Sequence, residues 1–190
     1  MSGYGRLFRP ATYVLGLGLA NEWIHSQIGE VVPVRGASMQ PVLNPAYQGS
    51  DVADPGRVSG HQDRVFVRRL NESHASLHHG DVVTCVDPHD RRQVLIKRVI
   101  GLPGDVVETL RYSQRFCRIP EGHCWIEGDN QADSIDSNDF GPVPLGLLRG
   151  KALAVVRPWN RMQWLDHQLG AERDGGVRAE AALWDKTRSF

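Results

Sequence analysis

Residues 94–100 read VLIKRVI, an apolar run that carries a lysine and an arginine near its centre. Its β-branched residues favour a strand, because such side chains pack well on a pleated surface. Successive side chains of a strand point to opposite faces, so Lys97 faces the same way as Leu95 and Val99 and away from Arg98. The run therefore predicts a buried strand that contains an amine shielded from water.

Short runs of the same kind lie on both sides of this strand. Turn-forming residues separate predicted strands at 31–35, 64–68, 80–86, 106–110, 116–119, 124–127 and 152–156. Residues 44–63 are rich in Gly, Pro, Ser and Asp without periodicity, which indicates a loop. The pattern predicts an all-β fold.

The chain has 190 residues, a length that suits one domain with appended segments. We expect an N-terminal targeting or anchor segment over 1–30, a main domain over 31–160 and a tail over 161–190 that is partly helical or disordered. In the tail, Met162, Trp164, Leu165 and Leu169 suggest one or two helical turns. Lys plus Arg and Asp plus Glu both number 22, so no overall charge attracts nucleic acid.

The cysteines and histidines predict neither a metal site nor a cofactor. The three cysteines show no zinc-type spacing, although Cys117 and Cys124 could pair across a hairpin or stay free. The eight histidines lack the H-E-x-x-H spacing that places two ligands on one helix face. They are interpreted as solvated loop residues.

The amino end has three possible interpretations. Arg6 and Arg9 precede ten residues without charge, 11–20, which suits a membrane anchor that would have to continue to about Ile28. The small-x-small sequence at 18–20 would also suit a cleaved signal peptide. An interfacial or partner-packed helix is the third possibility.

Ser38 lies in the run 34–41, VRGASMQP. Gly36 permits close approach of the backbone and Pro41 interrupts regular structure, so this kink can present a hydroxyl in an open position. A buried lysine loses its proton more readily and can then accept the proton of a serine. Ser38 and Lys97 together indicate a Ser/Lys hydrolase.

Four sequence blocks between Val31 and Pro158 resemble the type I signal peptidase family and occur in its order. They are Ser38-Met39-x-Pro41, Gly80-Asp81-Val82-Val83, the block from Lys97 to Asp105, and Gly128-Asp129-Asn130 with Ser134-x-Asp136-Ser137. The resemblance implies a serine endopeptidase with a signal peptidase-like β core and an N-terminal membrane-anchor helix. Among the interpretations of the amino end, it favours the anchor, with the flanking arginines setting its orientation.

The resemblance also implies roles for individual residues. Ser38 would be the nucleophile and Lys97 its general base. Ser134 would orient the amine, Asp136 would be a structural acid, and Asp129 would fix its loop. An extended substrate would lie beside two segments, with the candidate binding residues Pro33, Val34, Arg35, Gly36, Leu95 and Ile96.

The chain departs from the family pattern at two places. Many members have a second serine where this chain has Gly36, so the oxyanion should depend on the Ser38 N–H, and a second donor is not identifiable. Bacterial members usually carry an arginine at the position of Asn138. The chain resembles the mitochondrial inner-membrane branch of the family in three features: that asparagine, the sequence 140–142 and the short interval 106–127.

That branch implies removal of sorting peptides from precursor proteins delivered to the intermembrane space. The catalytic domain would face that space from the inner membrane, in a hetero-oligomer with a second catalytic subunit. Two alternatives stay open: a bacterial-type or organellar leader peptidase, and a largely structural subunit of a hetero-oligomeric protease. A self-cleaving repressor is disfavoured because no DNA-binding helices precede Ser38.

Overall fold

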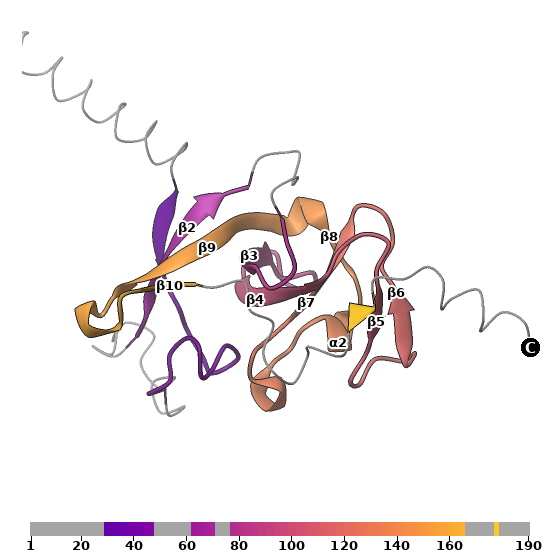
Figure 1. Cartoon of the computed structure of the whole chain (residues 1–190), viewed down its shortest axis with the longest axis horizontal. Coiled ribbons are helices and arrows are strands. Elements are labelled where there is room, and N and C mark those ends of the chain that lie inside the picture. The colour runs from indigo at the N-terminus through magenta and orange to yellow at the C-terminus, as the bar shows by residue number, and fades with distance from the viewer. Residues whose placement is uncertain (1–28, 48–61, 71–76, 166–176, 179–190) are drawn as a thin grey trace, which may run out of the picture.

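The computed structural model describes residues 29–47, 62–70, 77–165 and 177–178 (Figure 1). These residues form mainly strands, so the all-β prediction is confirmed for them. The strands are β1 (Glu30–Pro33), β2 (Arg64–Arg69), β3 (Val82–Val86), β4 (Val94–Gly101), β5 (Val106–Glu108), β6 (Phe116–Arg118), β7 (His123–Glu127), β8 (Val143–Pro144), β9 (Leu148–Arg157), β10 (Gln163–Trp164) and β11 (Val177–Arg178). The helices are one turn each: η2 (Gln131–Asp133), α2 (Ser137–Phe140), η3 (Leu145–Leu147) and η4 (Trp159–Arg161).

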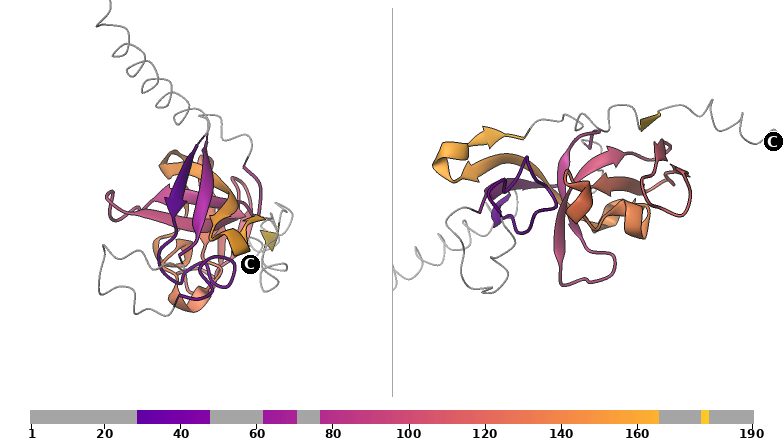
Figure 2. Two further views of the ribbon diagram at one scale, coloured as in Figure 1. Left: turned by 90° about the vertical axis from the view of Figure 1, so that its left-hand side faces the viewer. Right: turned by 90° about the horizontal axis from the view of Figure 1, so that it is seen from below.

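Strand β9 joins the two halves of the larger sheet. The order is β1-β2-β9-β3-β4-β7-β8, with β10 added to β9, while β11, β5 and β6 form a separate three-stranded sheet. The pairings of β9 with β2 and with β3 contain register shifts, which bend the sheet. The β9–β10 hairpin and the β5–β6 pair lie at opposite ends of the molecule (Figure 2).

Two strand edges border the same space without a partner in the described part of the chain. Strand β1 pairs on one side only, with β2. In β4, residues 94–97 pair with β3, whereas the pairing with β7 begins at Arg98. An unpaired edge offers backbone N–H and C=O groups to an added strand.

Buried side chains hold the segment after β1 against the sheet. Met39 and Leu43, at 1% and 0% exposure, pack with Val65 of β2 and Val155 of β9. A second cluster lies around Val83, Val99 and Ile126, and a third surrounds Trp125 beside the small sheet. The residue after Ser38 is therefore an anchor of the main core.

A buried polar latch closes the long loop between β1 and β2. The Asn44 N–H donates to Asp63 Oδ2 and the Asp63 N–H donates to Asn44 Oδ1, both at 2.8 Å. Asn44 Nδ2 also donates to the Val34 carbonyl at 2.8 Å. Arg161 forms an ion pair with the same Asp63 carboxylate. The latch ties both ends of the loop to η4.

The carboxyl segment differs from its prediction. The helical turns expected from residue 161 are absent in the described residues to 165, where β10 pairs with β9 instead. Here the open backbone edge of β9 supplies ladder hydrogen bonds, which outweigh a weak helical pattern. Most of 166–190, and residues 1–28 of the anchor segment expected over 1–30, lie outside the described residues. Among the helices described, none is long and apolar enough to cross a bilayer.

The three cysteines are free thiols and all are buried. The possible Cys117–Cys124 disulfide is therefore absent. Burial raises the pKa of Cys85 and of Cys124 to about 12, so both thiols stay protonated at physiological pH and serve as apolar core residues.

We expect Asp63→Ala to lower the free energy of unfolding by about 3 kcal/mol, since it leaves Arg161 and the Asn44 N–H without their acceptor. Urea denaturation of the full chain would measure the change. Glu121→Ala, at an exposed turn, is the control and should cost no more than about 0.5 kcal/mol. Equal losses in the two variants would contradict the latch.

Candidate active site

The loop that carries Ser38 is fixed by contacts on both sides of the serine. Gly36 has a φ of 82°, in the left-handed region that glycine tolerates best. The Ser38 carbonyl accepts a hydrogen bond from the Asn130 N–H at 3.0 Å, and Asn130 Nδ2 donates to the Ala37 carbonyl at 3.2 Å. The serine is half-buried, so its hydroxyl is both positioned and accessible.

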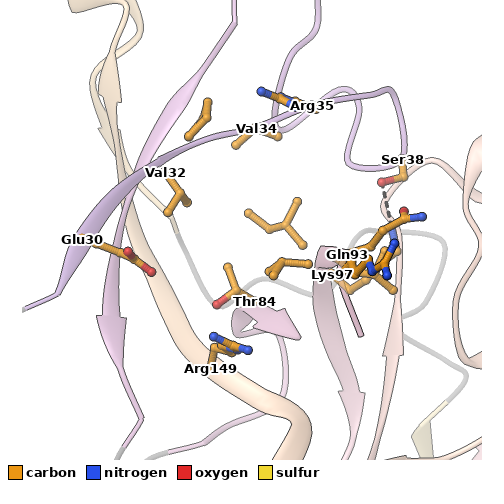
Figure 3. Close-up of a pocket in the computed structure, with 14 residues that line it drawn as sticks. Glu30, Val32, Val34, Arg35, Ser38, Thr84, Gln93, Lys97 and Arg149 are labelled. Atoms are coloured by element: carbon orange, nitrogen blue, oxygen red, sulfur yellow. Dashed lines mark hydrogen bonds between the residues drawn. The ribbon is translucent and has the colours of Figure 1, made fainter. Parts of the chain in front are cut away.

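The amine of Lys97 lies against this hydroxyl. Lys97 is 3% exposed on β4, and its Nζ is 2.7 Å from Ser38 Oγ (Figure 3). The two residues are far apart in the sequence and come from different elements. The structure thus brings together the two residues that the sequence singled out, at a distance suited to proton transfer.

Burial lowers the pKa of the Lys97 amine below its ordinary value, because the charged form loses its hydration. The negative charges of Asp136, Asp129 and Asp87 oppose this effect, in that order. Desolvation is the larger effect. The amine is therefore more readily neutral than a surface lysine, and a neutral amine can accept a proton.

Ser134 lies close to the serine loop but bonds to an acid. Its hydroxyl donates to Asp136 Oδ2 at 2.6 Å, whereas the resemblance implied a contact with the lysine. A carboxylate is the stronger acceptor, which explains this choice. A Cβ on Gly128 would collide with both Ser134 Oγ and the Ser38 carbonyl, so glycine there permits the close approach of the two segments.

Asp136 organises the segment between β7 and β8. One carboxylate oxygen accepts the Gly128 N–H at 3.0 Å, and the other accepts the Asn138 N–H at 3.0 Å as the N-cap of α2. Asp136 is 1% exposed, and these bonds stabilise its charge without water. Its observed contacts are those of a structural acid.

Asn138 connects this segment to the rest of the domain. Its Oδ1 accepts the Leu110 N–H at 2.8 Å, and its Nδ2 donates to Glu127 at 2.9 Å. Trp125 donates to the same Glu127 oxygen at 2.8 Å. The residue that departs from the bacterial pattern thus serves as a buried connector.

Arg111 is a site residue that sequence reasoning missed. Its guanidinium binds both oxygens of Asp139, and its Nη2 is 3.6 Å from Asp136 Oδ1. It also donates to the Ser134 carbonyl. A cation near Asp136 is therefore supplied from the loop after β5. The turn sequence around Arg111 contains no motif that could have indicated this.

Two further buried ion pairs fix the strands around Lys97. Arg98, on the opposite face of β4, makes two bonds of 2.7 Å to the carboxylate of Asp129 and one of 2.8 Å to the Gly80 carbonyl. Lys151 Nζ lies 2.7 Å from Asp81 Oδ1. Asp129 therefore fixes its loop in the structure, as expected.

A cavity of about 530 Å³ opens beside the Ser38–Lys97 contact (Figure 3). It runs between β1 and the first half of β4. Of the six candidate substrate-binding residues, five line it: Pro33, Val34, Arg35, Leu95 and Ile96. Gly36 is not among its lining residues. The cavity is therefore bounded by the two strand edges that lack a partner in the described ranges.

His79 is a partly exposed turn residue, with a side chain 38% exposed, but it also makes a contact that the sequence did not indicate. His79 Nε2 lies 2.6 Å from Asp105 Oδ2, so this side chain joins the turn before β3 to the turn after β4. His78 and His89 are solvated, with side chains 68% and 73% exposed. Within the described ranges, no three His, Cys, Asp or Glu side chains are placed to hold a metal ion.

Comparison with known proteins identifies the family. The family model described as "Signal peptidase, peptidase S26" matches residues 13–112 and 108–159. The chain belongs to this family. The resemblance drawn from the four sequence blocks is thereby confirmed, and the chain is a peptidase by membership.

The relatives are subunits of one protease. The chain is 36% identical to mitochondrial inner membrane protease subunit 2 of Danio rerio, over 97% of this chain and 96% of the relative. It is 41% identical to subunit 2 of Mus musculus over 75% of each chain, and 32% identical to subunit 1 of that species over 89% and 94%.

A solved signal peptidase I from Enterococcus faecalis V583 superposes with a TM-score of 0.35 at 23% identity. The superposition covers 40% of this chain and 96% of the signal peptidase I chain. At that score the superposition is partial, and the family assignment rests on the sequence relatives.

We expect Arg111→Gln to raise the pKa of Lys97. Loss of the guanidinium leaves the charge of Asp136 less balanced, and a more negative surrounding favours the ammonium form. The chain has three lysines, Lys97, Lys151 and Lys186, so an NMR titration of their Cε atoms would resolve Lys97.

Arg115→Gln is the matched control, because Arg115 lies on the same loop as Arg111, pairs with Glu108 of β5 instead, and has a side chain that is 78% exposed. It should leave the Lys97 titration unchanged. An unchanged or lower Lys97 pKa in Arg111→Gln would refute the role assigned to that guanidinium.

Proposed function

We propose that the chain is a membrane-bound serine endopeptidase with a Ser/Lys dyad, which removes sorting peptides from proteins delivered to the mitochondrial intermembrane space. The observation that carries the proposal is the 2.7 Å contact between the buried Lys97 amine and the accessible Ser38 hydroxyl. Membership of the signal peptidase family and the names of the relatives support the substrate class.

Catalysis begins when neutral Lys97 takes the proton of Ser38 and Ser38 Oγ bonds to the scissile carbonyl carbon. The resulting oxyanion accepts a hydrogen bond from the Ser38 N–H, which bonds to no residue in the described part of the chain. The C–N bond then breaks, and the Lys97 ammonium gives its proton to the leaving amine. Water, deprotonated by Lys97, cleaves the acyl-enzyme ester and regenerates Ser38.

The substrate binds as an added strand. An extended segment in the cavity would face the free edges of β1 and of residues 94–97, and backbone hydrogen bonds to either edge need no particular side chain. Val34 and Ile96 line the cavity beside the dyad. The family implies small substrate residues next to the cleaved bond, where these apolar walls would receive them.

The N-terminal segment anchors the enzyme in the inner membrane, with the catalytic domain in the intermembrane space. Arg6 and Arg9 precede the uncharged run and hold the amino end on the matrix side. The relatives are named as subunits 1 and 2 of one protease, which supports assembly with a second catalytic subunit. Asp136 remains a structural acid, and Ser134 positions the segment beside the dyad.

Ser38→Ala and Lys97→Met should each lower kcat/KM for a precursor by on the order of 10²–10⁴-fold or more. The double variant should lose little further, because the two residues act as one unit. The assay uses the full chain in lipid, with and without a candidate partner subunit. Near-normal cleavage by either single variant would refute the dyad, and activity confined to the partner would indicate a structural subunit.

The free energy of unfolding of Lys97→Met shows whether the variant is inactive because it lacks the catalytic base or because it does not fold. The pKa of Lys97 is lower in the folded than in the unfolded chain, so burying the charged amine lowers the free energy of unfolding. This loss of stability is complete at pH values below the folded pKa. It disappears at pH values above the unfolded pKa. Methionine removes this loss of stability. The variant should therefore be at least as stable as the wild type at pH 6, with the difference shrinking as pH rises.

We expect kcat/KM to rise with pH along one limb whose midpoint lies below the ordinary pKa of lysine. The neutral amine is the active form, so the midpoint reports Lys97 in the free enzyme. Ser134→Ala should lower the rate while moving the midpoint little, because that hydroxyl acts on position. A flat profile through the neutral range, or a midpoint at that of a free lysine, would contradict the tuned base.

A further inference from the structure

The end of the cavity away from the dyad carries charged side chains. Glu30 and Arg149 line it there, on the side opposite Ser38 and Lys97 in Figure 3. Arg92 and Arg35 also line the cavity, from the turn before β4 and the loop after β1. Three guanidinium groups and one carboxylate thus come from separate elements.

The backbone of Arg149 is fixed where three strands meet. Its carbonyl accepts the Leu70 N–H at 3.3 Å, and the next residue, Gly150, pairs with Arg69 of β2 and Thr84 of β3. A Cβ on Gly150 would collide with Val67 and with the backbone of residue 68, so the strands approach closely there. Arg149 therefore projects from a rigid base.

Arg92 likewise projects from a pinned turn. Its N–H donates to Asp90 Oδ1 at 3.0 Å, and the Gln93 N–H donates to the Asp90 carbonyl at 2.9 Å. The Gln93 carbonyl accepts the Asp87 N–H at 3.1 Å. The Arg92 side chain itself is exposed.

The guanidinium groups of Arg35, Arg92 and Arg149 have no ion pair with any described residue, in contrast to those of Arg98 and Arg111. Glu30 likewise has no ion pair with any described residue. Cations held in a concave site attract a negative ligand more strongly than scattered surface cations. With three arginines and one glutamate among these lining residues, the cavity is more positive than negative.

We propose that this enzyme selects precursors with an acidic side chain several residues from the cleaved bond, bound by Arg149 and Arg92. The inference rests on the proposed function, whose substrate class it narrows. A guanidinium suits a carboxylate because its planar donors match the two oxygens. Arg149 and Arg92 are assigned as specificity-determining residues.

The strand geometry limits the position of the acidic residue. Arg92 lies in the turn before β4, and β4 begins at Val94, three residues before Lys97. An extended chain rises about 3.3 Å per residue, so a substrate strand along β4 would reach Arg92 only with a residue more than about three positions from the cleaved bond. Glu30 acts against the selection, since its carboxylate faces the same cavity.

The test is a peptide scan with the full chain in lipid. Peptides of one parent sequence carry Asp, Asn or Lys at each position from about three to seven residues from the cleaved bond, on either side. We expect Asp to exceed Lys in kcat/KM by about fivefold at one or two adjacent positions, as for an exposed ion pair, and the preference to shrink at high salt.

Matched variants show which side chains cause the preference for Asp. Arg149→Gln combined with Arg92→Gln should abolish the preference. Arg91→Gln, at an exposed neighbour that does not line the cavity, should retain it, and Glu30→Gln should enlarge it. No preference at any scanned position, or an equal loss in Arg91→Gln, would overturn the inference.

A binding measurement keeps this test independent of the proposed function. If the wild type cleaves no peptide, the proposed function fails, and the Kd values of the Asp and Lys peptides for the full chain still test the selection. Tighter binding of the Asp peptide, lost in the double arginine variant, would support it. Equal Kd values would refute it.

Discussion

A lysine amine that is kept from water but next to a hydroxyl is the constraint on which this structure depends. Lys97 lies on β4 opposite Val83 of β3, and only 3% of the residue is exposed. The serine must then be brought to the amine, which is buried within the fold. The buried Met39 and the bonds from Asn130 hold Ser38 in that place.

Burial of the amine also restricts the carboxylates around it. A carboxylate without a neighbouring cation would raise the pKa of Lys97 and favour its ammonium form. Asp136 and Asp129 both lie near enough to act on Lys97 in this way. Each has an arginine beside it, Arg111 and Arg98 respectively. The acids that order the surrounding loops are therefore partly balanced by cations, so that desolvation still dominates at the amine.

The sequence predicted the features that depend on local pattern. Alternation and β-branched content predicted the strands, and the unusual lysine together with the serine turn predicted the pair that the fold brings together. The partner of Ser134, the guanidinium of Arg111 and the His79–Asp105 contact were missed. Ser134 bonds to Asp136 within its own turn, two residues further on, where no periodic pattern indicates a partner. The other two contacts depend on which loops meet in space, and turn sequences carry no periodicity that predicts this.

The carboxyl segment illustrates the same limit. Met162, Trp164 and Leu165 fit a weak helical pattern, but the free edge of β9 was available to Gln163 and Trp164 as a partner. Whether an edge is free depends on the order of strands in the whole sheet. A window of local sequence does not contain that order.

The two strand edges beside the cavity, which have no partner among the described residues, also bear on aggregation of the chain. An open edge can pair with another copy of the chain and start aggregation. Here β1 is only four residues long and ends at Pro33, which has no N–H to donate. Charged side chains stand beside both edges, Glu30 on one and Arg92 before the other. An edge this short and charged resists the long, flat pairing from which fibrils grow, and it stays open as the proposed strand addition requires.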